Sequence, residues 1–553
     1  MDGPAPPCRL RHLAADVIGL PRAAAALLSD RPHPSGFPGL CLPRAASDID
    51  RRVGAADSPF LDRDELVDAL ERAYADAPEP PSIHPAQRDN LRRLRDPRSQ
   101  VVVCGQQPGF LGGPLFNLYK AVQTIAVARA LEREWHLPVV PLFWVHSDDH
   151  DLAEVHHAYV LNRNLDLARV GLPAMGSGRR PIGRIALDAE EHRLASLRGH
   201  LLQVLPVTAF REPLLDQVFP REGETLGQAF VRGLCGLLGD QGLLPVEPES
   251  IRTPISRALA SLLAGDPRAD FAKGHAQARA AGAADDLDLD RVPWAFELRD
   301  GQRTALRGCP GGFQLDGVPG TRTATEAAAE VVQDPTRWSP SVISRPLVQD
   351  ACLPIAAYVG GYGELNYHLT LLELRRARSW RSPAFIPRFS ATISSPAART
   401  ALARLDISAE AFLRRGGSLP DSGSTPSPVA EEIRQMGDKY SASALELSTS
   451  AQQLDRSLGP QLKRAAREAR ALFEKLARKA ERIDANRRGK SRRHLRRLQN
   501  TWWGRDLPQE RSLTALQYAI AFGSDWIPTL IEDIDPFGLE HVLIELSTAS
   551  ADP

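Results

Sequence analysis

The sequence predicts an α/β fold, with a core built on a parallel sheet and a following α-helical coiled-coil domain. Two unbroken apolar runs, residues 100–104 and 139–145, enclose a helical pattern over residues 115–134. Such runs are typical of strands covered on both faces, and a strand, a crossover helix and a second strand form a βαβ unit. From about residue 395 to 505 glycine becomes sparse and charged residues become dense, which indicates long exposed helices.

Length and composition limit the class of protein. A chain of 553 residues is too long for one ordinary core, so we expect about two to four domains. Hydrophobic residues make up 43% and charged residues 25%, as in soluble globular proteins. The 68 basic and 68 acidic residues balance to a formal net charge of zero, which argues against nucleic acid or an anionic membrane as the main partner.

Several features predict a cytoplasmic protein. The first twenty residues lack the basic and apolar regions of a signal peptide, and no run approaches the roughly eighteen apolar residues of a membrane span. The six cysteines are scattered without CxxC pairs, which predicts a reducing compartment and no disulfide framework.

Each segment has a predicted place in this architecture. Residues 1–60 are rich in proline and arginine and predict a loop-rich start, followed by helical patterns around 62–75 and 85–95. A strand, a glycine cluster and a helix recur in residues 339–377. The predicted domains are the first part of the core (1–165), an insertion (166–335), the second part of the core (336–394), a helical coiled-coil domain (395–505) and a return to the core (506–553).

The helical domain is predicted to be a hairpin. One apolar seam repeats at spacings of three and four, as in coiled coils: Leu462, Ala465, Ala469, Leu472, Leu476, Ala480 and Ile483. Gly459-Pro460 should interrupt the helix, because proline clashes with the preceding turn. The basic run at residues 487–497 is interpreted as a solvated helix end, with nucleic-acid binding as the alternative.

Three polar loops follow predicted strands and are expected to converge on one pocket, because ligands bind beyond the carboxyl ends of parallel strands. They are "CGQQPGFLGGP", "VHSDDHDLAEVHH" and "VGGYGE". The glycines of the first and third loops suit an anion cradle, although a structural turn explains them equally well. The first loop matches neither a Walker A motif nor a dinucleotide fingerprint.

The second loop has three possible interpretations. Ser147 could cap a helix whose positive end attracts Asp148 and Asp149. The i,i+4 spacing of His146 and His150 permits a metal site, but no HExxH motif and no complete ligand set is present. A role in holding an amine, or in acting as a base, fits carboxylates beside a neutral imidazole best.

Four blocks, "VVVCGQQPGFLGGPLFNLYKA", "FWVHSDDHDLAEVHHAYV", "RPLVQDACLPIAAYVGGYGELNYH" and "IPRFSATI", resemble the cysteine ligase family of bacillithiol biosynthesis, in the family's order. The resemblance implies a Rossmann-like core with connecting-peptide insertions and a coiled-coil domain that forms a homodimer. It also implies that cysteine is added to glucosaminyl-malate in the last step of the pathway, with ATP or another nucleotide, and Mg²⁺, activating the carboxyl group.

The resemblance also implies the site residues. The catalytic candidates are Asp149, His150 and Asp151, with no metal ligands. The candidates for binding substrate or nucleotide are Gly105, Gln106, Gln107, Gly113, Asn117, Lys120, Asp148, Arg345, Asp350, Gly360, Gly361, Glu364 and Arg388. The chain departs from the family pattern around this pocket at Cys104, His146, Asp148, Tyr362 and Asn366.

Two other functions stay open at this point. One is a metal-dependent hydrolase that uses the acid and histidine cluster at residues 146–157. The other is a non-enzymatic scaffold joined through the coiled coil.

Overall fold

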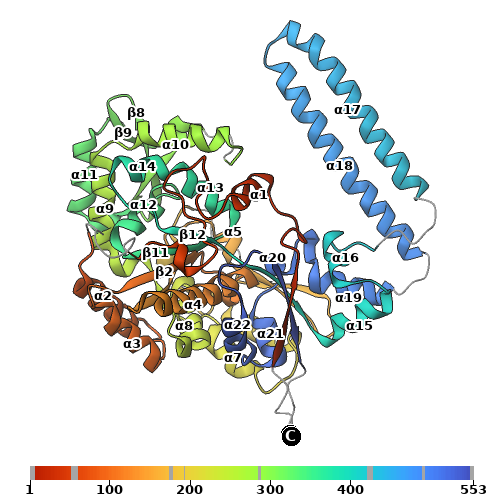
Figure 1. The fold of residues 1–553 in the computed structure, drawn as a ribbon, viewed down its shortest axis with the longest axis horizontal. Coiled ribbons are helices and arrows are strands. Elements are labelled where there is room, and N and C mark those ends of the chain that lie inside the picture. The colour runs from red at the N-terminus through yellow and green to blue at the C-terminus, as the bar shows by residue number, and fades with distance from the viewer. Residues whose placement is uncertain are drawn as a thin grey trace. The chain divides into compact units, whose positions relative to one another are not determined.

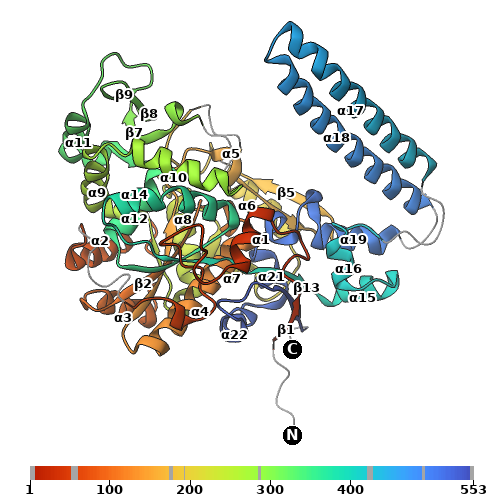
Figure 2. The same ribbon diagram turned by 45° about the horizontal axis from the view of Figure 1, so that its top comes forward.

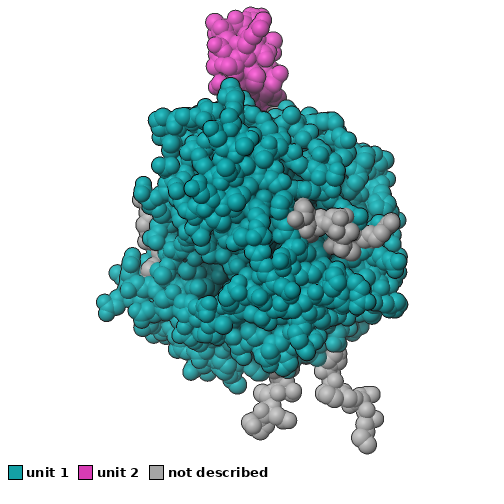
Figure 3. Space-filling view, turned by 90° about the vertical axis from the view of Figure 1, so that its left-hand side faces the viewer, with its two compact units in different colours: residues 1–396, 507–553 teal, residues 397–506 magenta. Residues whose placement is uncertain are grey.

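The computed structural model describes residues 7–51, 60–173, 178–191, 193–283, 288–419, 427–487 and 492–547. These residues form two compact units (Figure 3). The first unit comprises residues 1–396 and 507–553, and the second comprises residues 397–506.

The first unit is built on a five-stranded sheet in which all neighbouring strands are parallel. Its strands, in spatial order, are β12 (Ala384–Pro387), β11 (Ile355–Gly360), β2 (Gln100–Gln106), β3 (Val139–Val145) and β6 (Leu244–Val246). The register pairs Gln106 of β2 with Val145 of β3, so the carboxyl ends of the strands lie along one edge. The apolar runs at 100–104 and 139–145 thus form the centre of the sheet, as predicted.

Strand β6 lies inside the range that the sequence predicted to be an insertion, 166–335. That boundary prediction needs correction, because residues 244–246 belong to the core sheet. A strand of three residues carries no measurable periodicity, and its parallel partner β3 lies about a hundred residues earlier in the chain, so the sequence offered no local signal.

Helix α4 (Leu115–Trp135) packs against β2 and β3. It is buried on all sides, which explains why its sequence shows no polar face. In Figures 1 and 2, α4 lies on one side of β2 and β11, and α12 and α14 lie on the other side. The remaining helices before the second unit are α1 (Arg22–Ser29), α2 (Arg63–Ala75), α3 (Pro85–Leu94), α5 (Leu152–Val155), α6 (Leu194–Val204), α7 (Arg211–Val218), α8 (Leu226–Leu238), α9 (Arg252–Ala264), α10 (Arg268–Ala280), α11 (Ala324–Gln333), α12 (Ser344–Cys352), α13 (Tyr362–Thr370) and α14 (Leu372–Ala377).

The 166–335 range also holds most of a second, antiparallel sheet. Its order is β10 (Trp338–Pro340), β7 (Pro293–Arg299), β8 (Gln302–Cys309) and β9 (Gly312–Leu315). A separate hairpin joins β4 (His157–Leu161) to β5 (Leu167–Gly171). The antiparallel sheet matters for the site because it carries Arg303 on β8.

The carboxyl-terminal segment, residues 507–553, belongs to the first unit. It forms α20 (Gln509–Ser512), α21 (Leu516–Phe522), α22 (Trp526–Asp533) and β14 (His541–Leu546). Strand β14 lies between β1 (Cys8–Leu13) and β13 (Ser390–Ser394) in a third sheet. The expected loop-rich start therefore contains a strand, which the sequence did not reveal because its partner lies more than 500 residues away.

The second unit contains α15 (Pro396–Leu405, whose first residue is assigned to the first unit), α16 (Ala409–Arg414), α17 (Pro428–Leu454), α18 (Leu458–Arg487) and α19 (Arg492–Trp502). Helices α17 and α18 lie side by side as the predicted hairpin (Figures 1 and 2). Residues 455–457 separate them, and Pro460 lies in the first turn of α18, where proline is tolerated.

The predicted seam of α18 is only partly correct. Gly459, Ala466 and Ala477 are the buried positions of α18 for which burial is described, whereas Leu472, Leu476 and Ile483 are 55%, 42% and 47% exposed. The small alanines let α17 approach closely, so the buried stripe runs through them and not through the larger side chains. Two apolar stripes overlap on this helix, and periodicity alone could not separate them.

No helix among the described residues is long and apolar enough to cross a membrane. All six cysteines are free.

The docking of the carboxyl-terminal strand gives a test of the fold. Ile544 on β14 is fully buried, so Ile544→Ala should lower the free energy of unfolding by about 2–5 kcal/mol through lost burial and a residual cavity. Val207→Ala is the control, because Val207 is 67% exposed and its loss should change stability by less than about 0.5 kcal/mol. Urea denaturation measures both, and equal effects of the two substitutions would contradict the docking of β14.

Candidate active site

The three predicted loops meet at a cavity of about 530 Å³ along the carboxyl edge of the parallel sheet. Each of the five strands contributes a lining residue at or just after its carboxyl end: Gln106, His146, Pro248, Gly361 and Arg388. Ten of the sequence-predicted site residues line this cavity: Gln106, Gln107, Lys120, Asp148, Asp149, His150, Arg345, Gly361, Glu364 and Arg388.

The floor of the cavity is held by a buried ion pair between Lys120 of α4 and Glu364 of α13. The Lys120 ammonium donates to Glu364 Oε2 at 2.6 Å, to the Gly105 carbonyl at 2.8 Å and to Gln106 Oε1 at 3.0 Å. Glu364 also accepts from the Tyr358 hydroxyl at 2.6 Å. Burial acts to raise the pKa of Glu364, but Lys120, the Tyr358 hydroxyl and the Gly361 N–H together outweigh burial, and the pKa is lowered.

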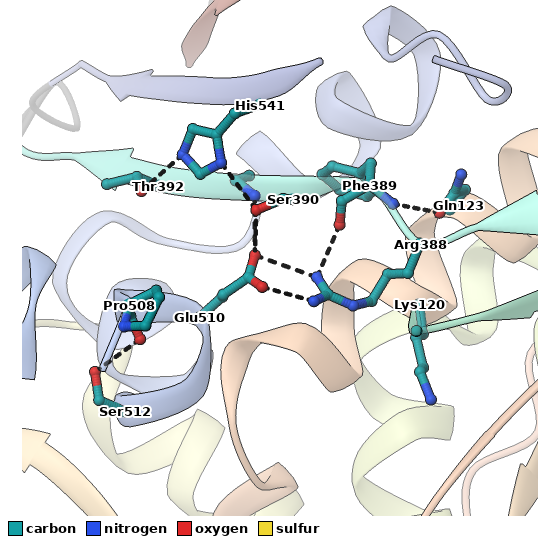
Figure 4. A network of polar contacts seen from close by, with 12 residues as sticks. Lys120, Gln123, Arg388, Phe389, Ser390, Thr392, Pro508, Glu510, Ser512 and His541 are labelled. Carbon is teal, nitrogen blue, oxygen red and sulfur yellow. Dashed lines mark hydrogen bonds and ion pairs between the residues drawn. The ribbon is translucent and has the colours of Figure 1, made fainter. Parts of the chain in front are cut away.

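A second buried pair fixes Arg388, which follows β12. Its guanidinium donates to both oxygens of Glu510, at 2.6 and 3.2 Å (Figure 4). Ser390 donates to the same carboxylate at 2.9 Å and also contacts Nδ1 of His541 at 2.8 Å. Burial lowers the pKa of His541 to about 4, so its ring is neutral near pH 7. The uncharged side chains of Ser390 and His541 therefore support the single ion pair between Arg388 and Glu510.

The acid and histidine segment after β3 is a loop with a turn at residues 147–148. The first following helix, α5, begins at Leu152 with Asp151 at its N-cap position, so the interpretation of Ser147 as a helix cap is wrong. Instead, Asp148 accepts two hydrogen bonds from Arg252, at 2.5 and 3.0 Å. Burial acts to raise the pKa of Asp148, but the surrounding arginines, Arg252 above all, together outweigh burial, and the pKa is lowered.

Asp149 and His150 face the cavity from the same loop. Asp149 accepts a hydrogen bond from the Gln107 side chain, which joins the first loop to the second. Arg303 lies 3.2 Å from His150 Nδ1 and 3.8 Å from Asp149. Burial and then Arg303 lower the pKa of His150, so the imidazole is neutral at neutral pH and can accept a proton.

Three polar atoms at the cavity wall have unused hydrogen-bonding capacity. Arg345 Nη1, His146 Nε2 and Trp144 Nε1 are buried and have no partner among the residues that the structure describes. Burial, then Arg345 and Lys120, lower the pKa of His146 well below its usual value. Buried polar groups normally find partners, so unpartnered groups at a cavity point to a ligand.

Six predicted site residues lie outside this cavity: Gly105, Gly113, Asn117, Asp151, Asp350 and Gly360. Asp350 is buried and pairs with Arg375 at 2.6 Å, and Asp151 is exposed at the start of α5. Asn117 donates to the Gly112 carbonyl and lines a separate small apolar pocket.

The three glycines of this group serve packing. A Cβ at Gly105 would lie 2.5 Å from His146 Nε2, one at Gly113 would lie 2.5 Å from the Asn117 amide, and one at Gly360 would lie 2.8 Å from Phe385 and Tyr358. Their small size therefore accommodates neighbouring side chains. The expectation that they cradle an anion finds no support in this geometry.

Sequence reasoning missed five residues that shape the site, among them Arg511, which lines the cavity and adjoins Glu510 in the chain. Arg252 and Arg303 come from the 166–335 range, where no pattern was readable, and Glu510 comes from the distant carboxyl-terminal segment. Glu247 follows β6 directly, and burial raises its pKa to about 7. An acidic residue after a short apolar run was the one signal that could have identified Glu247.

The cavity does not offer an evident metal site. No group of three or more His, Cys, Asp or Glu side chains within the described ranges could hold a metal ion. The lining carboxylates of Asp148, Asp149 and Glu364 are each engaged by Arg252, Gln107 or Lys120. The geometry therefore gives no support to the metal-dependent hydrolase.

The Asp148–Arg252 pair predicts a pH-dependent loss of stability. Arg252→Met strands a buried carboxylate and should cost about 3–5 kcal/mol of unfolding free energy at pH 7.5. Burial then raises the pKa of Asp148, so the carboxyl group takes up a proton in mild acid and the deficit relative to wild type should shrink toward pH 5.

Urea denaturation at the two pH values measures this deficit. Arg92→Met is the matched control, because Arg92 and its partner Asp89 are 76% and 54% exposed and such pairs contribute at most about 1 kcal/mol. A deficit for Arg252→Met that stays constant between the two pH values would contradict the assignment.

Comparison with known proteins places the chain in a family. Residues 44–389 match the family described as "Bacillithiol biosynthesis BshC, N-terminal Rossmann-like domain", and residues 391–546 match its "C-terminal coiled-coil domain". A relative from Heliobacterium modesticaldum named "Putative cysteine ligase BshC" is 29% identical over 500 residues, covering 87% of this chain and 90% of its own.

Two further relatives carry the same name. The one from Bacillus licheniformis is 26% identical over 510 residues and matches 86% of this chain and 89% of its own. The one from Shouchella clausii is 27% identical over 553 residues and matches 97% and 98%. With both of its domains matched in order and the Rossmann-like core confirmed by the parallel sheet, the chain belongs to the BshC family of bacillithiol biosynthesis.

Proposed function

We propose that the protein is a ligase that joins cysteine to glucosaminyl-malate through an amide bond, the last step of bacillithiol biosynthesis. Family membership and the names of the relatives support this reaction. The observation that carries it is the arrangement of one cavity, in which a neutral imidazole and a carboxylate, His150 and Asp149, share the walls with unpaired cationic groups.

The charges of the cavity favour an anionic substrate. Five cationic side chains line it against three carboxylates. Glu364 neutralises Lys120, and Glu510 neutralises Arg388 from behind the wall. Arg345 and Arg511 have no hydrogen-bonded or ion-paired side-chain partner among the described residues, so their charge is available to an anionic ligand.

Amide formation also requires an amine without its extra proton. The amino group of the sugar attacks the activated carboxyl carbon of cysteine, and one proton must leave the nitrogen as the new bond forms. In this proposal Asp149 attracts the ammonium form, which releases its extra proton to water before the attack. His150 accepts the second proton as the amide bond forms and the activating group leaves. Asp151, a catalytic candidate from the sequence, has no part in this scheme because it lies outside the cavity.

We propose that a nucleotide, ATP or another, activates the carboxyl group. A bound nucleotide would supply the leaving group for that carboxyl. A cavity of about 530 Å³ is within the usual range for small-molecule sites, and the guanidinium of Arg345, whose Nη1 has no partner among the described residues, suits phosphate oxygens. Mg²⁺ fits this site only as an ion held by phosphates, because the lining carboxylates are already engaged.

We further propose a homodimer through the second unit. Helices α17 and α18 expose a set of large apolar side chains: Met436, Tyr440, Leu447, Leu472, Leu476 and Ile483. An exposed apolar face of this kind suits a second copy of the hairpin, and light scattering at micromolar concentration distinguishes dimer from monomer.

The alternative of a scaffold without activity leaves the polar cavity unexplained. The basic run that the alternative assigns to nucleic-acid binding falls partly on residues 488–491, outside the described part of the chain.

Removal of the proposed base tests the function. His150→Ala and Asp149→Asn should each lower bacillithiol production in a strain that lacks its own copy of the gene. For the purified protein, loss of a general base predicts a fall in kcat of about 10²- to 10⁴-fold. His200→Ala is the control, because His200 is an exposed histidine on α6. Normal thiol levels in both site variants would remove Asp149 and His150 from the mechanism.

The pH dependence follows from the same histidine. A base must be deprotonated to act, so activity is lost as the pH falls through its pKa. Burial and Arg303 lower the pKa of His150, so the acidic limb of kcat/KM should lie below about pH 6.5, the ordinary histidine value. Replacement of Arg303 by methionine should move that limb to higher pH, and a limb that does not move would exclude His150 as the titrating group.

A further inference from the structure

We propose that the carboxyl-terminal segment 509–512 completes the anion-binding end of the cavity. Arg511 binds a carboxylate of the malyl group together with Arg388, and Glu510 is a positioning residue that sets the direction of Arg388. This inference rests on the proposed function for the identity of the ligand, and it names the part of the cavity that receives the malyl group.

The segment is fixed against the core by hydrogen bonds that resemble strand pairing. The side chain of Gln509 accepts from the Ile393 backbone N–H at 2.6 Å and donates to the Ile393 carbonyl at 3.0 Å, so it pairs with β13. Just beyond α20, the Thr514 hydroxyl donates to the Leu111 carbonyl at 2.8 Å, and the Leu513 carbonyl accepts from the backbone N–H of Leu115 at 2.8 Å. Residues 510 and 511 are therefore held at both ends.

Glu510 uses both carboxylate oxygens to hold its neighbours. Oε1 accepts from Arg388 Nη2, and Oε2 accepts from Arg388 Nη1, from the Ser390 hydroxyl and from the Ala391 N–H at 3.1 Å (Figure 4). The side chains of Arg388 and Glu510 are only 9% and 2% exposed. A buried carboxylate with this many donors has one stable orientation, and it fixes the guanidinium of Arg388 at the cavity wall.

Arg511 differs from Glu510 in its exposure and in its lack of partners. Its residue is exposed, it lines the cavity, and no described residue forms a hydrogen bond or ion pair with its guanidinium. Since it follows Glu510 directly in α20, its side chain starts close to the Arg388 guanidinium that Glu510 holds. The free guanidinium of Arg511 can bind one carboxylate with two parallel hydrogen bonds. Both Nη atoms of Arg388 are already engaged by Glu510 and the Phe389 carbonyl, so Arg388 contributes a fixed positive group at the same wall.

Direct binding of L-malate to the full-length protein tests the proposal without any need for turnover. Isothermal titration calorimetry should show that Arg511→Gln weakens malate binding by about tenfold or more, the usual loss for a hydrogen bond between charged groups. Arg511→Lys should recover part of the affinity. Arg163→Gln is the matched control, because Arg163 is an exposed arginine in the turn between β4 and β5, away from the cavity.

The positioning role of Glu510 has its own measurement. Glu510→Gln should raise KM for glucosaminyl-malate and leave KM for cysteine unchanged, which a general loss of folding would not do. Its malate affinity should fall in the titration as well. Equal effects on both KM values would show a structural role only and would overturn the assignment of Glu510.

The outcomes separate this inference from the proposed function. Equal malate affinity of wild type and Arg511→Gln, or no malate binding by the wild type, overturns the inference whatever the ligase assay gives. Inorganic phosphate is the second probe, and an Arg511-dependent affinity for phosphate without one for malate also overturns it. Arg511-dependent malate binding by a protein that forms no amide supports the inference and counts against the ligase.

Discussion

The buried ion pair between Lys120 and Glu364 is the interaction on which the site depends. The Lys120 side chain is 2% exposed, and its ammonium has three hydrogen-bond acceptors, at the end of β2 and on α13. A buried charge is tolerated only when its partners are in place. The pair therefore ties α4 and β2 to the first turn of α13, segments about 240 residues apart in the chain. The Lys120–Glu364 pair thereby fixes the carboxyl ends of β2 and β11, which form one wall of the cavity.

The cationic side chains of the cavity fall into two groups, those that are paired with a carboxylate and those that are not. Glu364 pairs with Lys120 and Glu510 pairs with Arg388, so both cations are fixed in the wall, and Arg388 still lines the cavity. Arg345 and Arg511 keep their charge for a ligand, and the neutral ring of His150 lies beside Asp149 on the loop after β3. The cavity thus combines a cationic part with a part that can accept a proton, which is what the joining of an acidic acceptor and an amino acid requires. His146 and Tyr362, two of the chain's departures from the family pattern, both line this cavity.

The sequence predicted the centre of the fold well and its periphery poorly, for physical reasons. Strands β2 and β3 are buried on both faces, so their unbroken apolar runs have no other stable place. Strand β6 is too short to show a pattern, and β1 is defined by a partner at the other end of the chain. In α18 the small alanines form the buried stripe, and periodicity gave equal weight to the larger exposed leucines.

The candidate site shows the same division. Residues after the long strands, such as Gln107, His150 and Gly361, could be placed in one pocket from the rule for parallel sheets alone. Arg252, Arg303 and Glu510 could not, because each reaches the site through a tertiary contact that no local pattern encodes. The glycines looked like an anion cradle, yet Gly105, Gly113 and Gly360 accommodate protein side chains.

A double-mutant cycle on Lys120→Met and Glu364→Gln, read by urea denaturation, tests the central constraint most directly. We expect each single substitution to cost about 3–5 kcal/mol and the pair to cost less than the sum by about 1–3 kcal/mol. Effects that add to within about 0.5 kcal/mol would show that the two residues do not hold the site together.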